Sequence, residues 1–106
     1  MILSTTQEIP GKQIKKSLGL VKGNTIRARN LGRDIIAMLK NIVGGEIEEY
    51  TKLLAQSREQ AMDRMIASAE ELEADAIIGI RFSTSYIMQS AAEIMVYGTA
   101  VNLENK

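Results

Sequence analysis

Residues 46–74 place the strongest constraint on the fold, because this segment contains neither glycine nor proline. Along it, residues that suit a buried face recur every three or four positions: Ile47, Tyr50, Leu54, Ser57, Ala61, Met65, Ala69 and Leu72. That spacing follows one face of a helix and predicts a single long helix. Glu46, Glu48 and Glu49 fall in its first turn, where carboxylates stabilise the positive end of the helix dipole.

The length of this predicted helix indicates that the protein is not a compact monomer. Twenty-nine residues at ~1.5 Å each span about 43 Å, whereas a compact chain of 106 residues has a diameter of about 34 Å. The helix must therefore either break, which we expect around residues 56–58, or extend onto another chain. We predict a homo-oligomer.

The charges of the chain are separated into two segments of opposite sign. Segment 46–74 carries eight acidic and three basic residues, and segment 12–40 carries eight basic residues and one acidic residue. Such opposed segments in a chain of zero net charge indicate contact between them, within one subunit or between subunits. The alternative, two solvated faces that never meet, stays open.

The first third of the chain is predicted to be β structure. We expect a short strand at 2–6, a turn at Pro10-Gly11, and an irregular β segment at 13–29. Within that segment, Gly23-Asn24 suits a hairpin turn, and Gly19 suits a bulge or a close backbone approach.

A first helix and two late strands complete the predicted order. Asn30 can cap a helix at about 31–43, which Gly44-Gly45 would end. The nearly continuous apolar run 76–82 suits a strand covered on both faces, and residues 92–103 alternate as a second strand. The order β-β-β-α-α-β-β predicts an α+β fold. We expect a single domain, 1–106, with two helices, one of them long, on one face of a largely antiparallel sheet.

Composition excludes several classes of protein. Thirteen basic and thirteen acidic side chains cancel, which argues against a general nucleic-acid or membrane-surface binder. Cysteine and histidine are both absent, so disulfides, zinc fingers and thiol nucleophiles are excluded and the most frequent general base is missing. We therefore expect no enzyme activity and no catalytic residues. Without a targeting signal or a membrane-spanning stretch, we expect a soluble cytoplasmic protein.

Two kinds of side chain could hold a cation, but each has a structural explanation. Carboxylates share a helix face in the pairs Glu46/Glu49, Glu59/Asp63 and Glu70/Glu73, which could bind Mg²⁺, Ca²⁺ or Mn²⁺. A solvated acidic face is the favoured interpretation. Met62 and Met65 could bind Cu(I), but packing in the core explains them more simply.

Arg81 lies within the apolar run 76–82, where an unpaired charge would be costly. Glu93, on the next predicted strand, is its expected partner. We predict a ligand site where the start of the long helix, with its glycines and outward-pointing amides, meets these strands. The expected site residues are Gly45, Glu46, Glu49, Tyr50, Arg81 and Glu93. Alternatively, the same groups form a helix cap and an inter-subunit salt-bridge network.

Several motifs occur in the order typical of a known family: 41–54 with Gly44-Gly45-Glu46, 58–62, 74–82, 92–94 and Tyr97-Gly98-Thr99-Ala100-Val101. On these motifs the chain resembles the YbjQ-like family of small bacterial and archaeal proteins. The resemblance implies a YbjQ-like, dodecin-like β/α subunit that assembles into a ring-shaped homopentamer. Glu73 stands where relatives often have a glycine, so the exit of the long helix is expected to differ.

The name of that family points to heavy metals, whereas soft metals prefer thiolate and imidazole ligands, and this sequence has neither. The cofactor is therefore left unknown. We expect an oligomeric protein that binds a metal ion or a small ligand at subunit junctions, with further copies of itself as partners. The alternative is a structural or protein-interaction oligomer with no small-molecule ligand. We expect no nucleic acid and no membrane among its partners.

Overall fold

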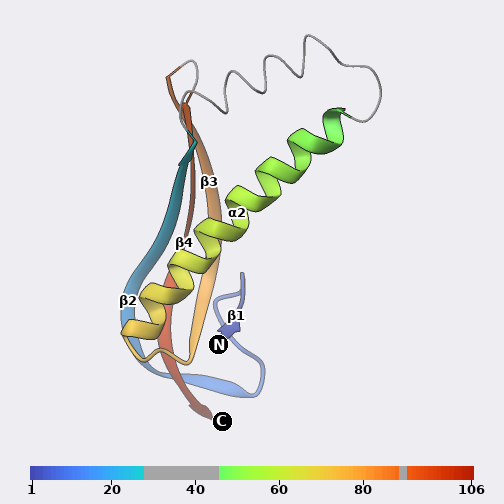
Figure 1. The fold of residues 1–106 in the computed structure, drawn as a ribbon. Coiled ribbons are helices and arrows are strands. Elements are labelled where there is room, and N and C mark those ends of the chain that lie inside the picture. The colour runs from blue at the N-terminus through green and yellow to red at the C-terminus, as the bar shows by residue number, and fades with distance from the viewer. Residues whose placement is uncertain (28–45, 89–90) are drawn as a thin grey trace.

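The computed structural model describes residues 1–27, 46–88 and 91–106, which form one sheet and one helix (Figure 1). The sheet has four strands in the order β1-β3-β4-β2. The elements are β1 (Ile2–Leu3), β2 (Lys12–Arg27), α2 (Glu46–Glu71), β3 (Ala76–Met88) and β4 (Ala91–Asn105). The predicted helix at 31–43 and its glycine end at 44–45 lie outside the described residues.

The sheet is mixed. Strand β4 pairs antiparallel with both β2 and β3, whereas the short β1 pairs parallel with β3. The predicted α+β class is therefore confirmed, with antiparallel pairing over most of the sheet. The predicted first strand is shorter than expected, because only Ile2 and Leu3 pair. The predicted late strands are both longer, and β3 continues through the polar stretch to Met88.

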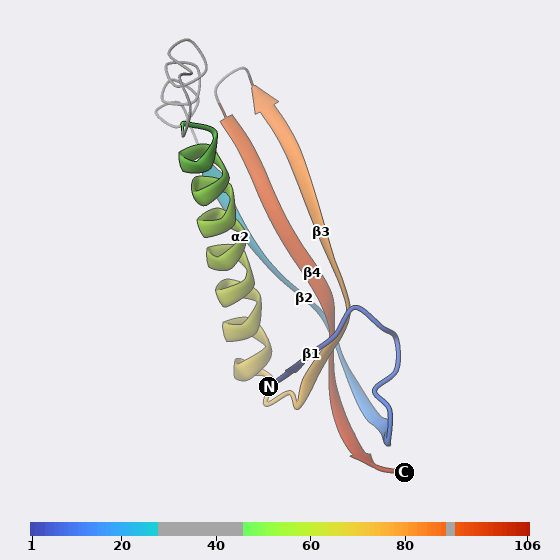
Figure 2. The ribbon, with the colours of Figure 1, turned by 90° about the vertical axis from the view of Figure 1, so that its right-hand side faces the viewer.

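Helix α2 covers one face of the sheet and packs mainly over β2 and β4 (Figures 1 and 2). Its buried stripe consists of small or flexible side chains four residues apart: Ser57, Ala61, Met65 and Ala69. These pack against apolar residues of the strands: Val21, Ile77, Ile80, Val96 and Ala100. The buried stripe follows the periodicity from which the helix was predicted, but the helix ends at Glu71, before the predicted end at about residue 74, and Leu72 is 44% exposed.

The predicted hairpin turn at Gly23-Asn24 is wrong, because β2 runs without a turn from Lys12 to Arg27. Gly23 instead lies beneath α2, where a Cβ atom would overlap the carbonyl oxygen of Ala61 and the backbone nitrogen of Met65. This glycine therefore serves a close approach of helix and strand. The prediction for Gly19 is confirmed, since β2 has a register shift between Ser17 and Gly19, where Gly19 has a φ of 104°.

The predicted break around residues 56–58 is also wrong, because α2 is continuous from Glu46 to Glu71. Ser57 is buried there, and its carbonyl oxygen accepts a hydrogen bond from the Thr25 hydroxyl at 3.3 Å. The weak apolar spacing at this point thus reflects a close contact with β2. The helix is followed by Glu73 in the left-handed region, with a φ of 60°.

A smaller apolar cluster lies on the other face of the sheet. Ala76, Ile78 and Val101 are buried there, with Ile9 and Leu103 packed against them. The N-terminal loop that contributes Ile9 crosses this face at one end only (Figure 2). The start of β3 is therefore covered on both faces, as its apolar run predicted.

The described chain is elongated. Its radius of gyration is 17.2 Å and its principal extents are 55 × 25 × 17 Å, whereas a compact chain of this length has a radius of gyration of about 13 Å. The N-terminal end of α2 diverges from the sheet (Figure 1). A long continuous helix is therefore accommodated by an elongated chain.

Candidate functional site

The predicted site is only partly within the described structure. Gly45 lies outside the described residues. Glu46, Glu49 and Tyr50 fall in the first two turns of α2, which begins at Glu46. Their part in a ligand site stays a prediction, whereas the positions of Arg81 and Glu93 can be compared directly.

The predicted pairing of Arg81 with Glu93 is wrong. In the register of the sheet, Arg81 lies opposite Tyr97, and Glu93 lies opposite Ser85. The two residues are therefore offset by four positions, which is roughly 13 Å along a strand. Arg81 Nη1 donates to the carbonyl oxygens of Thr5 at 2.9 Å and Ile80 at 2.8 Å. Glu93 Oε2 accepts a hydrogen bond from Asn24 Nδ2 at 3.2 Å.

Arg81 is also exposed rather than buried in an apolar strand. The cause is a register shift between Ile78 and Arg81, where Gly79 has a φ of 62°. A bulge inserts one residue and so moves all later side chains to the opposite face. Arg81 thereby faces away from α2 and contacts the N-terminal loop, and its charge needs no carboxylate partner.

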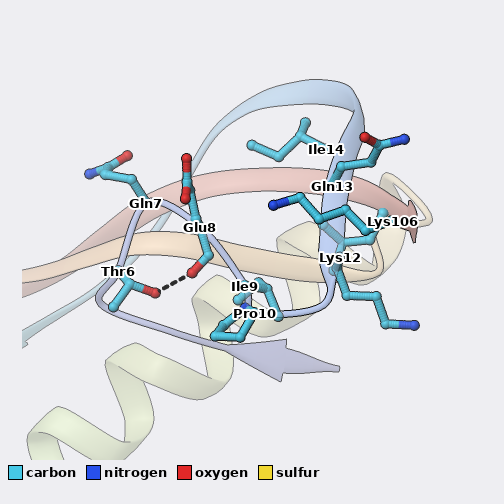
Figure 3. Close-up of a pocket in the computed structure, with 10 residues that line it drawn as sticks. Thr6, Gln7, Glu8, Ile9, Pro10, Lys12, Gln13, Ile14 and Lys106 are labelled. Carbon is cyan, nitrogen blue, oxygen red and sulfur yellow. Dashed lines mark hydrogen bonds between the residues drawn. The ribbon is translucent and has the colours of Figure 1, made fainter.

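A pocket of about 570 Å³ lies between the N-terminal loop and the beginning of β2 (Figure 3). The loop is fastened to β3 by backbone hydrogen bonds from Gly79 N to Thr6 O at 2.9 Å and from Ile80 N to Ser4 O at 3.1 Å. Within the loop, the Thr6 hydroxyl donates to the Glu8 carbonyl oxygen at 2.6 Å. The pocket is therefore formed by a loop held in one conformation.

The lining of this pocket combines apolar and charged groups. Ile9, Pro10, Ile14 and Leu103 contribute the apolar surface, and Glu8, Lys12 and Lys106 contribute charges of both signs. Gln13 Nε2 donates to Glu104 Oε1 at 2.8 Å, and Lys12 Nζ donates to Asn105 Oδ1. Such a lining suits a small polar organic molecule. In the sequence, the only signal for it was the turn at Pro10-Gly11.

The donor set for a metal ion is limited. In the part of the chain that the structure describes, no group of three or more Asp and Glu side chains converges on one point. Glu59 and Asp63 are exposed on α2, Met65 is fully buried and Met62 packs against the same core. The acidic-face and core-packing interpretations therefore agree with the structure. Because the sequence also lacks Cys and His, the described residues do not fit a soft heavy metal.

A family model with the description "Putative heavy-metal-binding" matches residues 1–104. The chain belongs to the YbjQ family. Its curated relatives are UPF0145 proteins. One from Dehalococcoides mccartyi is 59% identical over 104 residues, which are 98% of this chain and 100% of that protein. One from Colwellia psychrerythraea is 56% identical, covering 98% and 99% of the two chains. One from Methanosarcina acetivorans is 50% identical over the full length of both.

A solved structure supports the same fold for this YbjQ family member. It is the crystal structure of a DUF74-family protein of unknown function from Pediococcus pentosaceus, with a TM-score of 0.65 and 19% sequence identity. The match covers 98% of each chain. Within the described residues, no helix combines the length and apolarity needed to cross a membrane.

Proposed function

We propose that this protein is a self-associating binding protein that holds a small ligand at the junctions between its subunits. The observation that carries the proposal is its open, elongated architecture. The described subunit measures 55 × 25 × 17 Å and has one helix layer over a sheet whose two long edges are unpaired in the described chain. Unpaired strand edges are ready templates for pairing with another chain.

One of these edges belongs to β2, which pairs only with β4 in the described part of the chain along its 16 residues. The other belongs to β3 from Arg81 onward, because β1 pairs with Ala76 and Ile77 and the N-terminal loop accepts backbone hydrogen bonds from Gly79 and Ile80. Since the two edges are different surfaces, pairing one with the other joins subunits head to tail. Such a contact closes into a ring when the rotation between subunits fits. The family resemblance supplies the number five.

Exposed apolar side chains support self-association as well. Phe82 lies opposite the buried Val96 on the face that carries α2, yet it is 47% exposed, because α2 packs mainly over β2 and β4. Leu20, on the opposite face, is 69% exposed. The two side chains lie on different faces and form no single patch, but each would be covered if a neighbouring subunit packed against the adjoining strand edge.

The ligand part of the proposal is supported by the pocket at the beginning of β2. This pocket lies next to the edge that would enter the junction, and interfaces between subunits often complete concave sites. Its lining favours a small organic molecule. A hard cation would have to be held by carboxylates from more than one subunit. The proposed activity is binding and not catalysis.

The second candidate is a structural oligomer without a ligand, which the same open edges would support. Both candidates require self-association, which light scattering tests: we expect a mass of about five times the 11.7 kDa of the chain. A mass of 11.7 kDa at micromolar concentration rejects both candidates. Native mass spectrometry of protein purified without added metal separates them. A stoichiometric retained ligand supports the binding protein, and bare subunits support the structural oligomer.

A further inference from the structure

Three side chains that are far apart in the sequence form one row across the sheet. Lys22 in β2 lies opposite Tyr97 in β4, and Tyr97 lies opposite Arg81 in β3. Adjacent strands are about 4.8 Å apart, so the two cations flank the tyrosine at roughly 10 Å from each other. We call Lys22, Tyr97 and Arg81 the cationic row.

The cationic row lies on the face of the sheet away from α2, because its residues alternate along their strands with residues that pack against the helix, such as Val21, Ile80 and Val96. Tyr97 is half-buried. Its neighbours in the sequence, Val96 and Gly98, are buried on the opposite face of the strand, the one that carries α2. Lys22 likewise lies on the face opposite to that of its neighbour Val21, which is buried beneath α2. Of the described elements, only the N-terminal loop crosses this face, and it reaches the row at its edge, where Thr5 accepts a hydrogen bond from Arg81. Lys22 and Arg81 are both exposed.

The bulge at Gly79 is what adds Arg81 to this row. Without the extra residue, the alternation along β3 would place Arg81 on the same face as Ile77, under the helix layer. Gly79 allows the bulge, because its φ of 62° is a conformation that residues with a Cβ atom rarely adopt, and the backbone hydrogen bonds from Gly79 N to Thr6 O and from Ile80 N to Ser4 O hold the strand there. The hydrogen bonds to Thr5 and Ile80 then hold the guanidinium at the row. Bulges commonly re-aim a side chain next to a functional site.

The donors of the cationic row have no acidic partner among the described residues. On the described strands, the nearest carboxylate on this face is Glu93, two rows from Tyr97, and it is engaged by Asn24. The neighbouring rows present hydroxyl and amide groups from Ser83, Asn24 and Thr99. Two uncompensated cations about 10 Å apart on one open face attract an anion that can lie between them.

We propose that the cationic row binds the phosphate group of a small organic anion. Lys22 supplies a mobile ammonium, Arg81 supplies guanidinium donors in a fixed orientation, and the Tyr97 hydroxyl lies between them as a further donor. The exposed Leu20 in the next row offers an apolar surface for the organic part of the ligand. A neutral ligand would leave both charges unpaired, and a metal cation would be repelled.

This inference goes beyond the proposed function, because one subunit alone presents the complete row. It also differs from the pocket at the N-terminal loop, whose lining includes neither Lys22, Tyr97 nor Arg81. The two proposals can therefore fail separately.

Nuclear magnetic resonance titration of the ¹⁵N-labelled protein tests the row, with inorganic phosphate and AMP as probes and adenosine as the neutral control. We expect saturable shifts of the amides of Lys22, Tyr97 and Arg81 with both anions and none with adenosine. Lys22→Gln and Arg81→Gln should each raise the Kd by about tenfold, which corresponds to the loss of one charge-assisted hydrogen bond. Lys22→Gln is the decisive variant, because Arg81 also holds the N-terminal loop.

Lys16→Gln is the matched control. Lys16 belongs to the same strand and is also exposed, but it lies opposite Asn102, on the other face. An unchanged Kd for phosphate in this variant supports binding at the cationic row. An equal loss of affinity in Lys16→Gln and Lys22→Gln overturns it, and so does the absence of saturable shifts with either anion. Light scattering of the same samples separates the proposals: an oligomer that binds no phosphate rejects only the row, and a monomer that binds it rejects only self-association.

Discussion

Among the described residues, one face of the sheet is covered by α2, and the other is covered at one end only, by the N-terminal loop (Figure 2). On the helix side, small residues bring backbone close to backbone: Gly23 lies under Ala61, and the Thr25 hydroxyl reaches the carbonyl oxygen of Ser57. On the other side, the three long strands carry Lys22, Tyr97 and Arg81 outward. The helix side therefore tolerates little added volume, whereas the open side is the one on which we propose that an anion binds.

Gly23→Ala should show the largest effect and tests the close packing directly. An added methyl group would overlap the backbone of α2 at Ala61 and Met65, which cannot move without displacing the helix. We expect the free energy of unfolding to fall by roughly 4 kcal/mol, measured by chemical denaturation. Gly19→Ala is the control, because no atom lies within 4 Å of its Cβ position and only its φ of 104° opposes the substitution. If Gly19→Ala is the more destabilising, the helix is not closely packed on β2.

Replacing one methionine by alanine on each face of the sheet compares how closely the two faces are packed. Met65 is a residue of α2 and is fully buried between the helix and the sheet, whereas Met95 in β4 is half-buried on the open face. Met65→Ala should lower the free energy of unfolding by about 3 kcal/mol, because it removes buried methylene groups and leaves a cavity. Met95→Ala should cost less than about 1 kcal/mol. Equal losses in denaturant titrations would contradict an open face, since they would require Met95 to be covered as well.

The smallest effect is expected where the chain passes from the helix layer to the sheet. Glu73 has a φ of 60°, a conformation that a residue with a Cβ atom adopts at a cost of about 1 kcal/mol. Glu73→Gly should therefore raise the free energy of unfolding by about 0.5 kcal/mol, after the entropy that glycine loses on folding. Glu70→Gly, inside the exposed face of the helix, should lower it by about 1 kcal/mol. If thermal unfolding shows that both variants are destabilised, the positive φ of Glu73 does not cost the protein stability.

The long helix and its buried stripe could be predicted because helical periodicity is a local property. Residues 57, 61, 65 and 69 reveal their shared face from spacing alone, and the structure buries all four. Gly19 was predicted to mark a bulge or a close backbone approach from its glycine type within a β pattern, and the structure has a register shift there. Gly23 was wrongly predicted to lie in a hairpin turn, because the sequence does not distinguish a glycine in a turn from a glycine packed beneath a helix.

The candidate sites depended on contacts between distant segments. The sequence favoured Glu93 as the partner of Arg81, because both lie on neighbouring strands, but the register of β3 and β4 places Tyr97 opposite Arg81 and leaves Glu93 four positions away. The pocket at the N-terminal loop joins residues 6–14 to Leu103 and Lys106, which no local pattern relates.

By itself, the sequence determined the α+β class, the family, the long helix and the absence of thiolate and imidazole ligands, since these follow from composition and from patterns within short segments. Only the tertiary structure decided which face each strand residue occupies and which residues become neighbours. The physical reason is that one inserted residue in a strand reverses the face of every later side chain. Lys22, Tyr97 and Arg81 meet only after β2, β4 and β3 have paired in that register.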